Sequence, residues 1–595
     1  MFPDLRTFIQ KLRQEKLLLE IEAEVDPYLE LAEIHRRVIE AAGPALLFTK
    51  VKGSDYPVVT NLFGTRQRVD LAMGPQPERL LERAAASVPN LVPPKLPRLW
   101  AERKWLFPLT RVGLRDVTPA KAPVLQVKED GVDLRRLPVL TSWPEDGGPF
   151  VTLPLVYTEH PRTREHNLGM YRIQVKGAAL TGMHWQIHKG GGFHYYEAER
   201  LGEDLPVTLF LGGPPALILA AIAPLPEFVP ELLFASSLMG GKLERVRVEG
   251  SSHALIAQAE FAICGRVPAG VRQAEGPFGD HYGYYSLRHD FPVFEVQKVY
   301  HRKDAVYPAT VVGKPRQEDY FIGEYLQALL APLFPLVMPG VKALWTYAET
   351  GFHSLAAAIV RESYAREALT SAFRILGEGQ LSLTKFLLLT DAELNLRDFK
   401  AVLEHILTCF RPETDFILIP NTSMDTLDYT GRTFNQGSKA VMLGLGEPRR
   451  GLAHDYTGGP IPGLMRVEPF CAGCLLLQGD TYTAAPALPE DLLAWLRQIP
   501  AERFNAWPLL VLVDDLPSAQ TQTGFLWQVF TRFDPAQDIY AQTEVRQNRV
   551  VRRGPLLIDA RMKPWYPGEV EADPETVKLV DRRWREYSLP HWQRG

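Results

Sequence analysis

The first 90 residues carry helical patterns of apolar positions, followed by shorter strand-like runs. Apolar residues fall at helical spacing between residues 5 and 12, and Asp4 stands where a side chain can cap the first turn. A second helix is predicted after Asp26 and Pro27, which supply a cap and a first-turn proline, with Gly43 as its stop. Residues 45–48 and 56–60 have strand-like patterns. This part of the chain therefore predicts a small α/β unit.

The pattern changes near residue 120, where short apolar runs, some with alternating polarity, replace the long helical stretches. Such runs cover residues 151–157, 171–175, 206–211 and 293–296, and clusters of Gly, Pro and Asn separate them. This alternation and punctuation favour a mainly antiparallel sheet or barrel with a few helices inserted. Residues 322–330 have the pattern of a linking helix.

After residue 340, strand-like runs (385–389 and 415–419) alternate with helical ones (396–409), which is typical of an α/β domain. The tail from residue 573 has the pattern of a capped helix, and no fixed-period repeat is visible. The predicted fold is a multidomain α+β and α/β architecture. Its parts are an N-terminal α/β domain (1–119), a central sheet or barrel domain (120–320), a linker helix (321–340) and a C-terminal α/β domain with an extension (341–595).

Composition narrows the class of protein. The chain has 595 residues, of which 46% are apolar and 23% charged, and its formal net charge is −4. This is the balance of a globular protein, without the basic surplus of a nucleic-acid-binding one. The N-terminus lacks a signal pattern, and no apolar run approaches the roughly 20 residues of a membrane span. We therefore expect a soluble, cytoplasmic protein with no membrane span and no nucleic-acid partner.

Only four cysteines occur: Cys264, Cys409, Cys471 and Cys474. They are too few for a disulfide framework and suit a reducing compartment. Cys471 and Cys474 form a single CxxC pair, whereas a structural zinc site needs about four ligands. We interpret the pair as two half-buried thiols, and metal or redox use is the less favoured alternative.

Polar and ionisable residues concentrate in three segments of the central region, residues 166–172, 182–192 and 275–285. In the second segment the glycine run 190–192 follows Lys189, so several backbone N–H groups can approach an anion beside a cation. Two histidines of the same segment lie four residues apart. Two interpretations stay open for it, a phosphate or cofactor site and a structured loop.

The third segment carries a pair of carboxyl groups. Glu275 and Asp280 lie five residues apart, and the glycines and proline between them allow both side chains to turn toward one cavity. Arg172 is the obvious partner that would hold one carboxylate ionised. Crowding by like charge would raise the pKa of the other, which could stay protonated and act as an acid. The alternative is a surface turn with a structural ion pair.

Three motifs in this order resemble the UbiD family of decarboxylases. They are Asn167-x-Gly-Met-Tyr-Arg172, Met183-His-Trp-x-x-His188 and Glu275-Gly-Pro-x-Gly-Asp280-His-x-Gly-Tyr, and the similarity extends over most of the chain. Residues 530–540 are similar to the subgroup assigned to menaquinone biosynthesis, whose members act on naphthoate-type intermediates. The resemblance implies a carboxy-lyase that removes CO2 from an aromatic or α,β-unsaturated acid without net oxidation. It also implies a split β-barrel that binds flavin as the central domain.

The same resemblance implies prenylated FMN as cofactor, held with a divalent metal, usually manganese, and a potassium ion. The positions that match manganese ligands are Asn167, His188 and Glu231. An amide, an imidazole and a carboxylate suit a borderline-hard cation. Potassium is expected on backbone carbonyls near residues 220–223. The positions that match cofactor contacts are Thr152, Met170, Tyr171, Arg172, His184, Trp185, Gln186, Lys189, Gly190 and, from the C-terminal domain, Lys439. For Trp185, a place in the core is an equal alternative to stacking on the flavin.

In the implied reaction Arg172 binds the substrate carboxylate, Glu275 sets the orientation and charge of Arg172, and Asp280 protonates the carbon that CO2 leaves. The implied partners are an aromatic acid substrate, a flavin prenyltransferase that supplies the cofactor, and further copies of this chain. The copies would form a homodimer or a larger homo-oligomer through the C-terminal domain.

Other functions stay open at the level of sequence. An ordinary FMN-dependent split-barrel oxidoreductase would use the same phosphate-binding parts, but it needs no carboxylate pair beside an arginine. A catalytically idle scaffold subunit has no use for clustered titratable groups. Metal-dependent hydrolysis is the least favoured, because His184 and His188 flank Trp and Gln without the acidic residue of a zincin helix.

Overall fold

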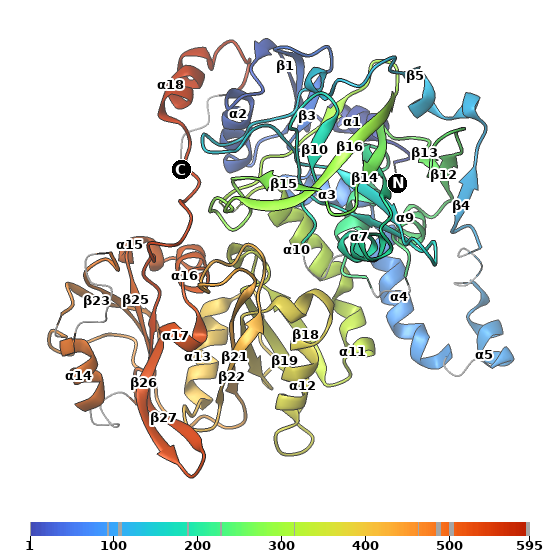
Figure 1. Ribbon diagram of the computed structural model, residues 1–595. Coiled ribbons are helices and arrows are strands. Elements are labelled where there is room, and N and C mark those ends of the chain that lie inside the picture. The colour runs from blue at the N-terminus through green and yellow to red at the C-terminus, as the bar shows by residue number, and fades with distance from the viewer. Residues whose placement is uncertain are drawn as a thin grey trace. The chain divides into compact units, whose positions relative to one another are not determined.

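The computed structural model of the chain divides into two compact units, of which the first combines residues 1–330 with 568–595 and the second is residues 331–567 (Figure 1). The structure describes residues 2–91, 95–104, 107, 110–186, 190–225, 229–314, 316–461, 463–483, 490–498 and 505–590. The last residues of the chain thus belong with the first unit, whereas the sequence placed them in the C-terminal domain.

A four-stranded sheet with the order β1-β2-β3-β17 opens the first unit. Its strands are β1 (Leu18–Val25), β2 (Ala45–Val51), β3 (Val58–Thr60) and β17 (Tyr307–Pro308), and the helices of this part are α1 (Leu5–Gln14), α2 (Glu30–Glu40), α3 (Arg66–Met73), α4 (Gln76–Leu91) and α5 (Leu96–Ala101). The predicted helix at residues 5–12 is confirmed as α1. Its predicted cap is confirmed too, because the side chain of Asp4 accepts the backbone N–H of Thr7 at 2.9 Å.

The start of α2 differs from the prediction. This helix begins at Glu30, four residues after the predicted cap. The reason is a separate turn, in which Oδ1 of Asp26 accepts the backbone N–H of Tyr28 at 2.9 Å instead of capping the helix. The apolar residues at positions 31, 34 and 38 of this helix are buried.

The central layer is an eight-stranded sheet whose main path runs β10-β16-β14-β11-β7-β8, with β15 and β5 paired to β16. Its strands are β5 (Val127–Lys128), β7 (Leu155–Glu159), β8 (His166–Gly169), β10 (Leu180–Gly182), β11 (Leu205–Leu211), β14 (Phe261–Val267), β15 (Arg272–Glu275) and β16 (His289–His301). Neighbouring strands are antiparallel, as the alternating pattern predicted. Among the described strands, β10 and β8 do not pair with each other, so the sheet stays open and does not close into a barrel.

Smaller elements complete this layer. One short sheet contains β13 (Leu255–Ile256), β12 (Leu243–Val246) and β4 (Leu114–Asp116), and another contains β6 (Phe150–Val151) and β9 (Ile173–Gln174). The inserted helices are α7 (Gly190–Leu201), α8 (Pro215–Ile222) and α9 (Glu231–Met239). The predicted helices among the strands are therefore confirmed.

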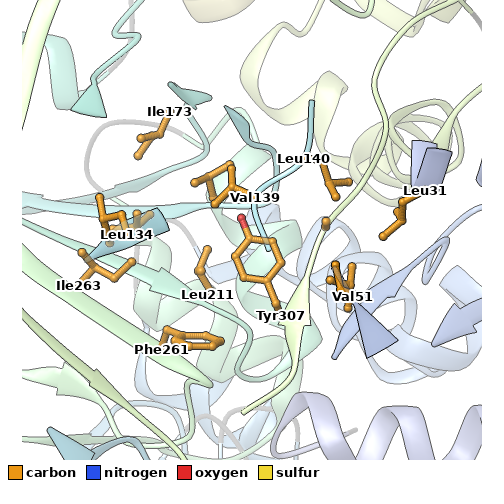
Figure 2. Packing of buried hydrophobic residues seen from close by; sticks show 14 of the residues in the cluster. Leu31, Val51, Leu134, Val139, Leu140, Ile173, Leu211, Phe261, Ile263 and Tyr307 are labelled. Atoms are coloured by element: carbon orange, nitrogen blue, oxygen red, sulfur yellow. The ribbon is translucent and has the colours of Figure 1, made fainter. Parts of the chain in front are cut away.

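One apolar core joins the N-terminal sheet to the central sheet. Leu31 and Val51 from the N-terminal part lie in the same buried cluster as Leu211 and Phe261 from the central sheet (Figure 2). Tyr307, on β17, is fully buried in this cluster. Because β17 follows the central strand β16 along the chain and pairs with β3, the chain itself ties the two layers together. Burial of each large apolar side chain contributes about 1.5–3 kcal/mol.

The tail of the chain packs on the N-terminal part of the first unit. Helix α18 (Pro574–Arg583) is the predicted capped helix, and Figure 1 shows it beside α2. Arg37 pairs with Asp581 at 2.6 Å, and the hydroxyl of Tyr587 donates to the buried Glu30 at 2.6 Å. These contacts are the reason why residues 568–595 cluster with the first unit.

The second unit contains two five-stranded sheets and confirms the predicted α/β alternation after residue 340. The strands of the first are β18 (Val341–Thr346), β19 (Leu355–Val360), β20 (Phe386–Thr390), β22 (Gln436–Gly444) and β21 (Phe416–Ser423), and those of the second are β23 (Arg466–Cys471), β24 (Cys474–Gln478), β25 (Leu509–Val513), β27 (Arg549–Asp559) and β26 (Ile539–Arg546). The helices of this unit are α11 (Phe334–Val337), α12 (Glu367–Leu376), α13 (Phe399–Cys409), α14 (Glu490–Gln498), α15 (Leu516–Ala519), α16 (Gln522–Phe530) and α17 (Pro535–Asp538). Cys471 and Cys474 are buried, unbonded thiols at facing positions of β23 and β24.

Helix α10 (Glu318–Leu330) ends the first part of the first unit. Its buried Glu318 accepts the backbone N–H groups of Asn61 at 3.1 Å and Phe63 at 2.8 Å. By length and composition alone, the stretch Glu318–Val337 passes as a membrane span, although the sequence analysis predicted none. Of this stretch 28% is buried, and its buried part includes Glu318, which contacts backbone N–H groups, and Ile322 in the next turn.

We expect Glu318→Ala to destabilise the first unit, because it leaves two buried N–H groups without an acceptor, which costs about 2–4 kcal/mol in total. Thermal unfolding and hydrogen exchange at residues 61–63 measure the effect. Glu324→Ala is the matched control, since Glu324 lies on the same helix, is half-buried and accepts the hydroxyl of Tyr320 at 3.0 Å. Equal effects of the two substitutions would contradict the role of Glu318.

Candidate active site

Arg172, Glu275 and Asp280 meet in one buried cluster. Arg172 donates from Nη2 to Glu275 Oε1 at 2.9 Å and from Nη1 to Asp280 Oδ2, so a single guanidinium bridges both carboxylates. Glu275 is fully buried and Asp280 is 7% exposed. The alternative of an ion pair on a surface turn is therefore wrong, because the three charged groups are buried and excluded from bulk solvent.

Strands of two sheets position the cluster. Arg172 directly precedes β9, and Glu275 ends β15, which pairs with β16. Ser286 Oγ lies 2.9 Å from Arg172 Nη2 and accepts the backbone N–H of Phe278 at 3.2 Å. The guanidinium carbon lies 4.8 Å from the centroid of the Phe278 ring. Packing and hydrogen bonds on several sides therefore hold Arg172 in one orientation.

Two histidines complete the cluster. His184 Nδ1 lies 2.9 Å from Glu275 Oε2, and His281 Nδ1 lies 2.7 Å from Asp280 Oδ1. The backbone N–H of His281 also donates to Asp280 Oδ1 at 2.8 Å. Each carboxylate thus contacts one imidazole and a part of the Arg172 guanidinium.

Burial and charge act in opposite directions on the two carboxyl groups. Burial alone would raise the pKa of Glu275, but the charges of Arg172 and His184 lower it to about 2. Burial likewise opposes ionisation of Asp280, yet the hydrogen bond from His281 and the charge of Arg172 bring its pKa below the ordinary value. The expectation that crowding keeps one carboxyl protonated is therefore wrong for the free protein, because the guanidinium lies between the two carboxylates.

Two further acidic residues lie beside the cluster and were missed in the sequence. Asp146 accepts the backbone N–H of Gly279 at 2.8 Å, which fixes the loop that carries Asp280, and burial raises the pKa of Asp146 to about 6. Burial also raises the pKa of Asp319, in the first turn of α10, to about 6. Neither residue belongs to one of the three motifs. The glycine pair directly after Asp146 is the only local signal.

Two of the three expected manganese ligands lie side by side. Asn167, on β8, donates from Nδ2 to Glu231 Oε1 at 2.9 Å, and its Oδ1 accepts the hydroxyl of Tyr171 at 3.0 Å. His188, the third, lies outside the described residues. Glu231 Oε2 is buried and has no hydrogen-bond partner in the described part of the chain. A buried carboxylate oxygen in this state is a position that a cation fits.

His166 is a residue of this region that the sequence reasoning did not select. Its Nε2 is buried, lacks a hydrogen-bond partner among the described residues, and lies 4.0 Å from Glu231 Oε2. Its place directly before Asn167 was the only signal in the sequence. Within the described residues no group of three or more His, Cys, Asp or Glu side chains could hold a metal. This finding does not test the expected manganese ligands, because Asn167 is an amide and His188 lies outside the described residues.

The expected cofactor contacts near β6 and β9 are mostly buried. The hydroxyl of Tyr171 also accepts the backbone N–H of Gly191 at 3.3 Å, and Thr152 Oγ1 accepts that of Thr310 at 3.0 Å. The remaining positions of this set in the first unit are the half-buried Met170 and Gln186 and, outside the described residues, Lys189.

Buried polar atoms without partners, beside glycines packed closely on Asn167 and Trp185, fit a bound polar cofactor. Trp185 Nε1 and His184 Nε2 are buried and have no hydrogen-bond partner among the described residues. A Cβ at Gly190 would lie 2.7 Å from Asn167 Nδ2, and one at Gly191 would lie 2.6 Å from Trp185 Nε1. Only glycine therefore permits this close approach at the start of α7. Buried polar groups without partners cost free energy, and a polar ligand would satisfy them.

Trp185 combines both interpretations that the sequence left open. Its ring belongs to the core cluster and packs on Tyr195 with centroids 5.2 Å apart. Its N–H, in contrast, has no acceptor in the described part of the chain. The indole thus packs in the core with its apolar body and leaves its donor for another group.

Lys439 lies in the second unit. Its Nζ is buried and donates to the carbonyl oxygen of Thr384 at 2.9 Å, and burial lowers its pKa to about 8. Its expected contact with a cofactor phosphate stays a prediction.

Three domain models of one family match the chain. They are the N-terminal domain of 3-octaprenyl-4-hydroxybenzoate carboxy-lyase at residues 9–88, its Rift-related domain at 115–315 and its C-terminal domain at 320–444. The chain belongs to the UbiD family. The match at residues 115–315 includes Arg172, Glu275 and Asp280, so the buried cluster lies in the central domain of a UbiD-type carboxy-lyase.

Relatives are similar over about three quarters of the chain or more. A 4-hydroxybenzoate decarboxylase protein of Chlamydia pneumoniae is 51% identical over 98% of this chain and 98% of its own. The UbiD-class enzyme HmfF from Pelotomaculum thermopropionicum, solved in complex with prFMN, is 26% identical with a TM-score of 0.61 and covers 78% of this chain and 98% of its own. Vanillic acid decarboxylase of Sedimentibacter hydroxybenzoicus, in its closed form, shares the fold at 24% identity and a TM-score of 0.67, with coverages of 77% and 97%.

We expect Glu275→Gln to destabilise this UbiD-family enzyme at neutral pH. The difference in stability between the variant and the unchanged protein should become smaller in acid. The folded protein lowers the pKa of Glu275 from 4.5 to about 2. The stabilisation by the carboxylate is therefore fully present above 4.5 and is lost as the pH falls through about 2. Thermal unfolding between about pH 6 and pH 3 measures the trend. Glu203→Gln, at an exposed position, is the control, and a pH-independent difference would contradict the role of Glu275.

Proposed function

We propose that this UbiD-family enzyme removes CO2 from an aromatic carboxylic acid, with prenylated FMN as its cofactor. The observation that carries the proposal is the buried guanidinium of Arg172 between Glu275 and Asp280. This combination can bind an anion and deliver a proton in a site that excludes bulk water. The HmfF structure in complex with prFMN supports the choice of cofactor.

Arg172 receives the substrate carboxylate in this mechanism. An incoming carboxylate competes with Asp280 for the N–H groups of the same guanidinium. When the substrate carboxylate takes over N–H groups of Arg172, the pKa of Asp280 rises, because Asp280 loses part of the contact that held it ionised. Burial of Asp280, which opposes its ionisation, acts in the same direction. Asp280 can then take up a proton and serve as the acid.

The net reaction converts a carboxylate and a proton into CO2 and a C–H bond. Prenylated FMN, when bound, supplies the acceptor for the electron pair that CO2 leaves behind. Arg172 binds and orients the carboxylate, and Glu275 fixes Arg172 through two N–H groups, at 2.9 and 3.1 Å. Asp280 delivers the proton to the carbon that CO2 leaves. A positioned acid typically contributes about 100- to 10,000-fold to the rate.

Metal binding belongs to the same proposal. Asn167, His188 and Glu231 would hold manganese at the cofactor phosphate, which the unpartnered oxygen of Glu231 supports. Potassium would bind carbonyl groups near residues 220–223, at the end of helix α8. The last carbonyl groups of a helix lack partners within it, and the helix dipole favours a cation there.

A naphthoate-type intermediate of menaquinone biosynthesis is the proposed substrate. Its support is the similarity of residues 530–540 to that subgroup, and this segment lies beyond the matched family domains, which end at residue 444. The relative from Chlamydia pneumoniae is named for 4-hydroxybenzoate, so that acid is the substrate to compare. A flavin prenyltransferase as cofactor supplier, a homo-oligomeric state and a cytoplasmic location complete the proposal. The structure of an evolved dimeric form of HmfF supports the oligomer.

The other functions are less favoured. An FMN-dependent oxidoreductase does not need a buried arginine between two carboxylates. A scaffold subunit would carry the cost of burying these charges without using them.

Co-expression with a flavin prenyltransferase should yield protein that carries prenylated FMN and manganese in native mass spectrometry. The loaded protein should release CO2 from a hydroxylated naphthoic acid faster than from 4-hydroxybenzoate. Faster release from 4-hydroxybenzoate would overturn the naphthoate substrate alone. Oxidation of NAD(P)H without CO2 release would overturn the decarboxylase and favour the oxidoreductase.

Asp280→Asn should keep the cofactor and lower turnover about 100- to 10,000-fold, because it removes the acid and leaves the side-chain shape. Arg172→Ala should fail more broadly, in both cofactor and substrate binding. Asp290→Asn is the control, since Asp290 is an exposed carboxylate on β16, the strand that follows the loop carrying Asp280. CO2 release and flavin content measure both effects, and unchanged turnover of Asp280→Asn would remove the proton-donor role.

A further inference from the structure

The two sheets of the second unit have the same topology. Both place their strands in the order first, second, third, fifth, fourth along the chain, as β18-β19-β20-β22-β21 and β23-β24-β25-β27-β26. In both, the middle strands are parallel and each edge strand is antiparallel to its neighbour. The connections match as well, because α12 and α14 follow the second strand and α13 and α16 follow the third. Unrelated α/β domains would rarely agree in order, direction and connection together.

The register of the two sheets also agrees. The first aligned row across the three parallel strands is Leu355, Phe386 and Ala440 in one sheet and Cys474, Leu509 and Leu556 in the other. In both sheets the first and third rows face one shared core, and the second row faces a separate core. A shift of the strand alignment by one residue would move every side chain to the opposite face of its sheet. The two sheets are therefore equivalent position by position.

Each sheet has an outer face of its own and an inner face that both share. Helix α12 covers the outer face of the first sheet and α14 that of the second. Figure 1 shows these helices on opposite sides, with α13 and α16 between the sheets. In the shared core, the ring of Phe399 on α13 lies 5.7 Å from Phe525 and 5.8 Å from Phe530, both on α16. The contact is thus made by equivalent helices of the two sheets.

Only the first sheet carries charge where its parallel strands begin. The residues directly before its first aligned row are Ser354, Lys385 and Lys439, whereas Gly473, Pro508 and Pro555 stand there in the second sheet. Lys385 is buried and pairs with Asp428 at 2.9 Å. The second sheet therefore keeps the packing faces of the first and lacks its polar edge.

We propose that residues 466–559 are a second copy of the C-terminal UbiD domain, and that this copy covers the inner face of the first copy in place of a second chain. The matched family domain ends at residue 444. HmfF is covered over 98% of its own length yet spans 78% of this chain, so part of this chain has no counterpart in it. A two-fold homodimer joins the same surface of two copies, and here equivalent helices of two like domains meet in the same manner. The inner face is closed to other chains, and a homo-oligomer must use another surface. This inference does not depend on the reaction that the enzyme catalyses.

A double-mutant cycle across the shared core tests the contact in the full chain. Leu403→Ala on α13 and Val529→Ala on α16 remove neighbouring side chains, which line one small cavity between the sheets. Their combined effect on the unfolding rate should differ from the product of the single effects by at least about threefold. Leu387→Ala is the matched control, because Leu387 is buried on the outer face of the first copy. When Leu387→Ala is combined with Val529→Ala, the effect on the unfolding rate should agree with the product of the two single effects within about twofold. If the effects of Leu403→Ala and Val529→Ala on the unfolding rate simply multiply, as in the control, the shared core would be overturned.

A second experiment opens the inner face. Leu526→Asp with Val529→Asp, both buried on α16, should detach the second copy, seen as faster hydrogen exchange in β24 and β25 with β19 and β20 still protected. The exposed face should then accept a second chain, so the mass in native mass spectrometry should double relative to the unchanged protein. Adding Leu403→Asp on α13 should restore the original mass. Detachment without a change in mass would overturn the proposal, and so would unchanged exchange in β24 and β25.

Discussion

The candidate active site depends on one buried ionic contact, in which the guanidinium of Arg172 bridges Glu275 and Asp280. Two carboxylates and one guanidinium leave an excess of negative charge, which burial makes costly. The imidazoles of His184 and His281 and the hydroxyl of Ser286 offset that cost through further polar contacts. A substrate carboxylate adds one more negative charge to this cluster. The most direct way to restore the balance is to protonate a carboxylate already present, which is the step that the proposed role of Asp280 needs.

The sequence predicted that these residues lie together, but it did not predict their electrostatics. Short motifs with fixed spacing revealed Arg172, Glu275 and Asp280, because glycine and proline between charged residues constrain where side chains can point. The pKa direction of Asp280 could not be predicted, since it depends on a guanidinium that lies between the two carboxylates only after folding. Asp146 and Asp319 were missed for the same reason: each reaches the cluster from a segment distant in the chain, and burial alone distinguishes its carboxyl.

The fold shows the same division between local and long-range information. Helix α1 and its Asp4 cap followed from local periodicity, and so did the alternating strands of the central layer. Whether that layer closes, and which unit receives the tail helix α18, depend on pairing between distant segments that no local pattern encodes. The start of α2 was misplaced because Asp26 and Pro27 suit a turn as well as a helix cap.

The duplication escaped detection because the two copies agree in pattern and not in residue identity. Equivalent rows pair Leu355 with Cys474, and Ala440 with Leu556, so what persists is alternation between two buried faces. Comparison of equivalent positions in the two copies thus distinguishes residues that the fold requires from residues that it does not require. The second copy reaches the same topology with prolines in place of Lys385 and Lys439, so burial of two ammonium groups is not a requirement of this fold. Because buried charge costs free energy, packing alone does not account for the polar edge of the first copy.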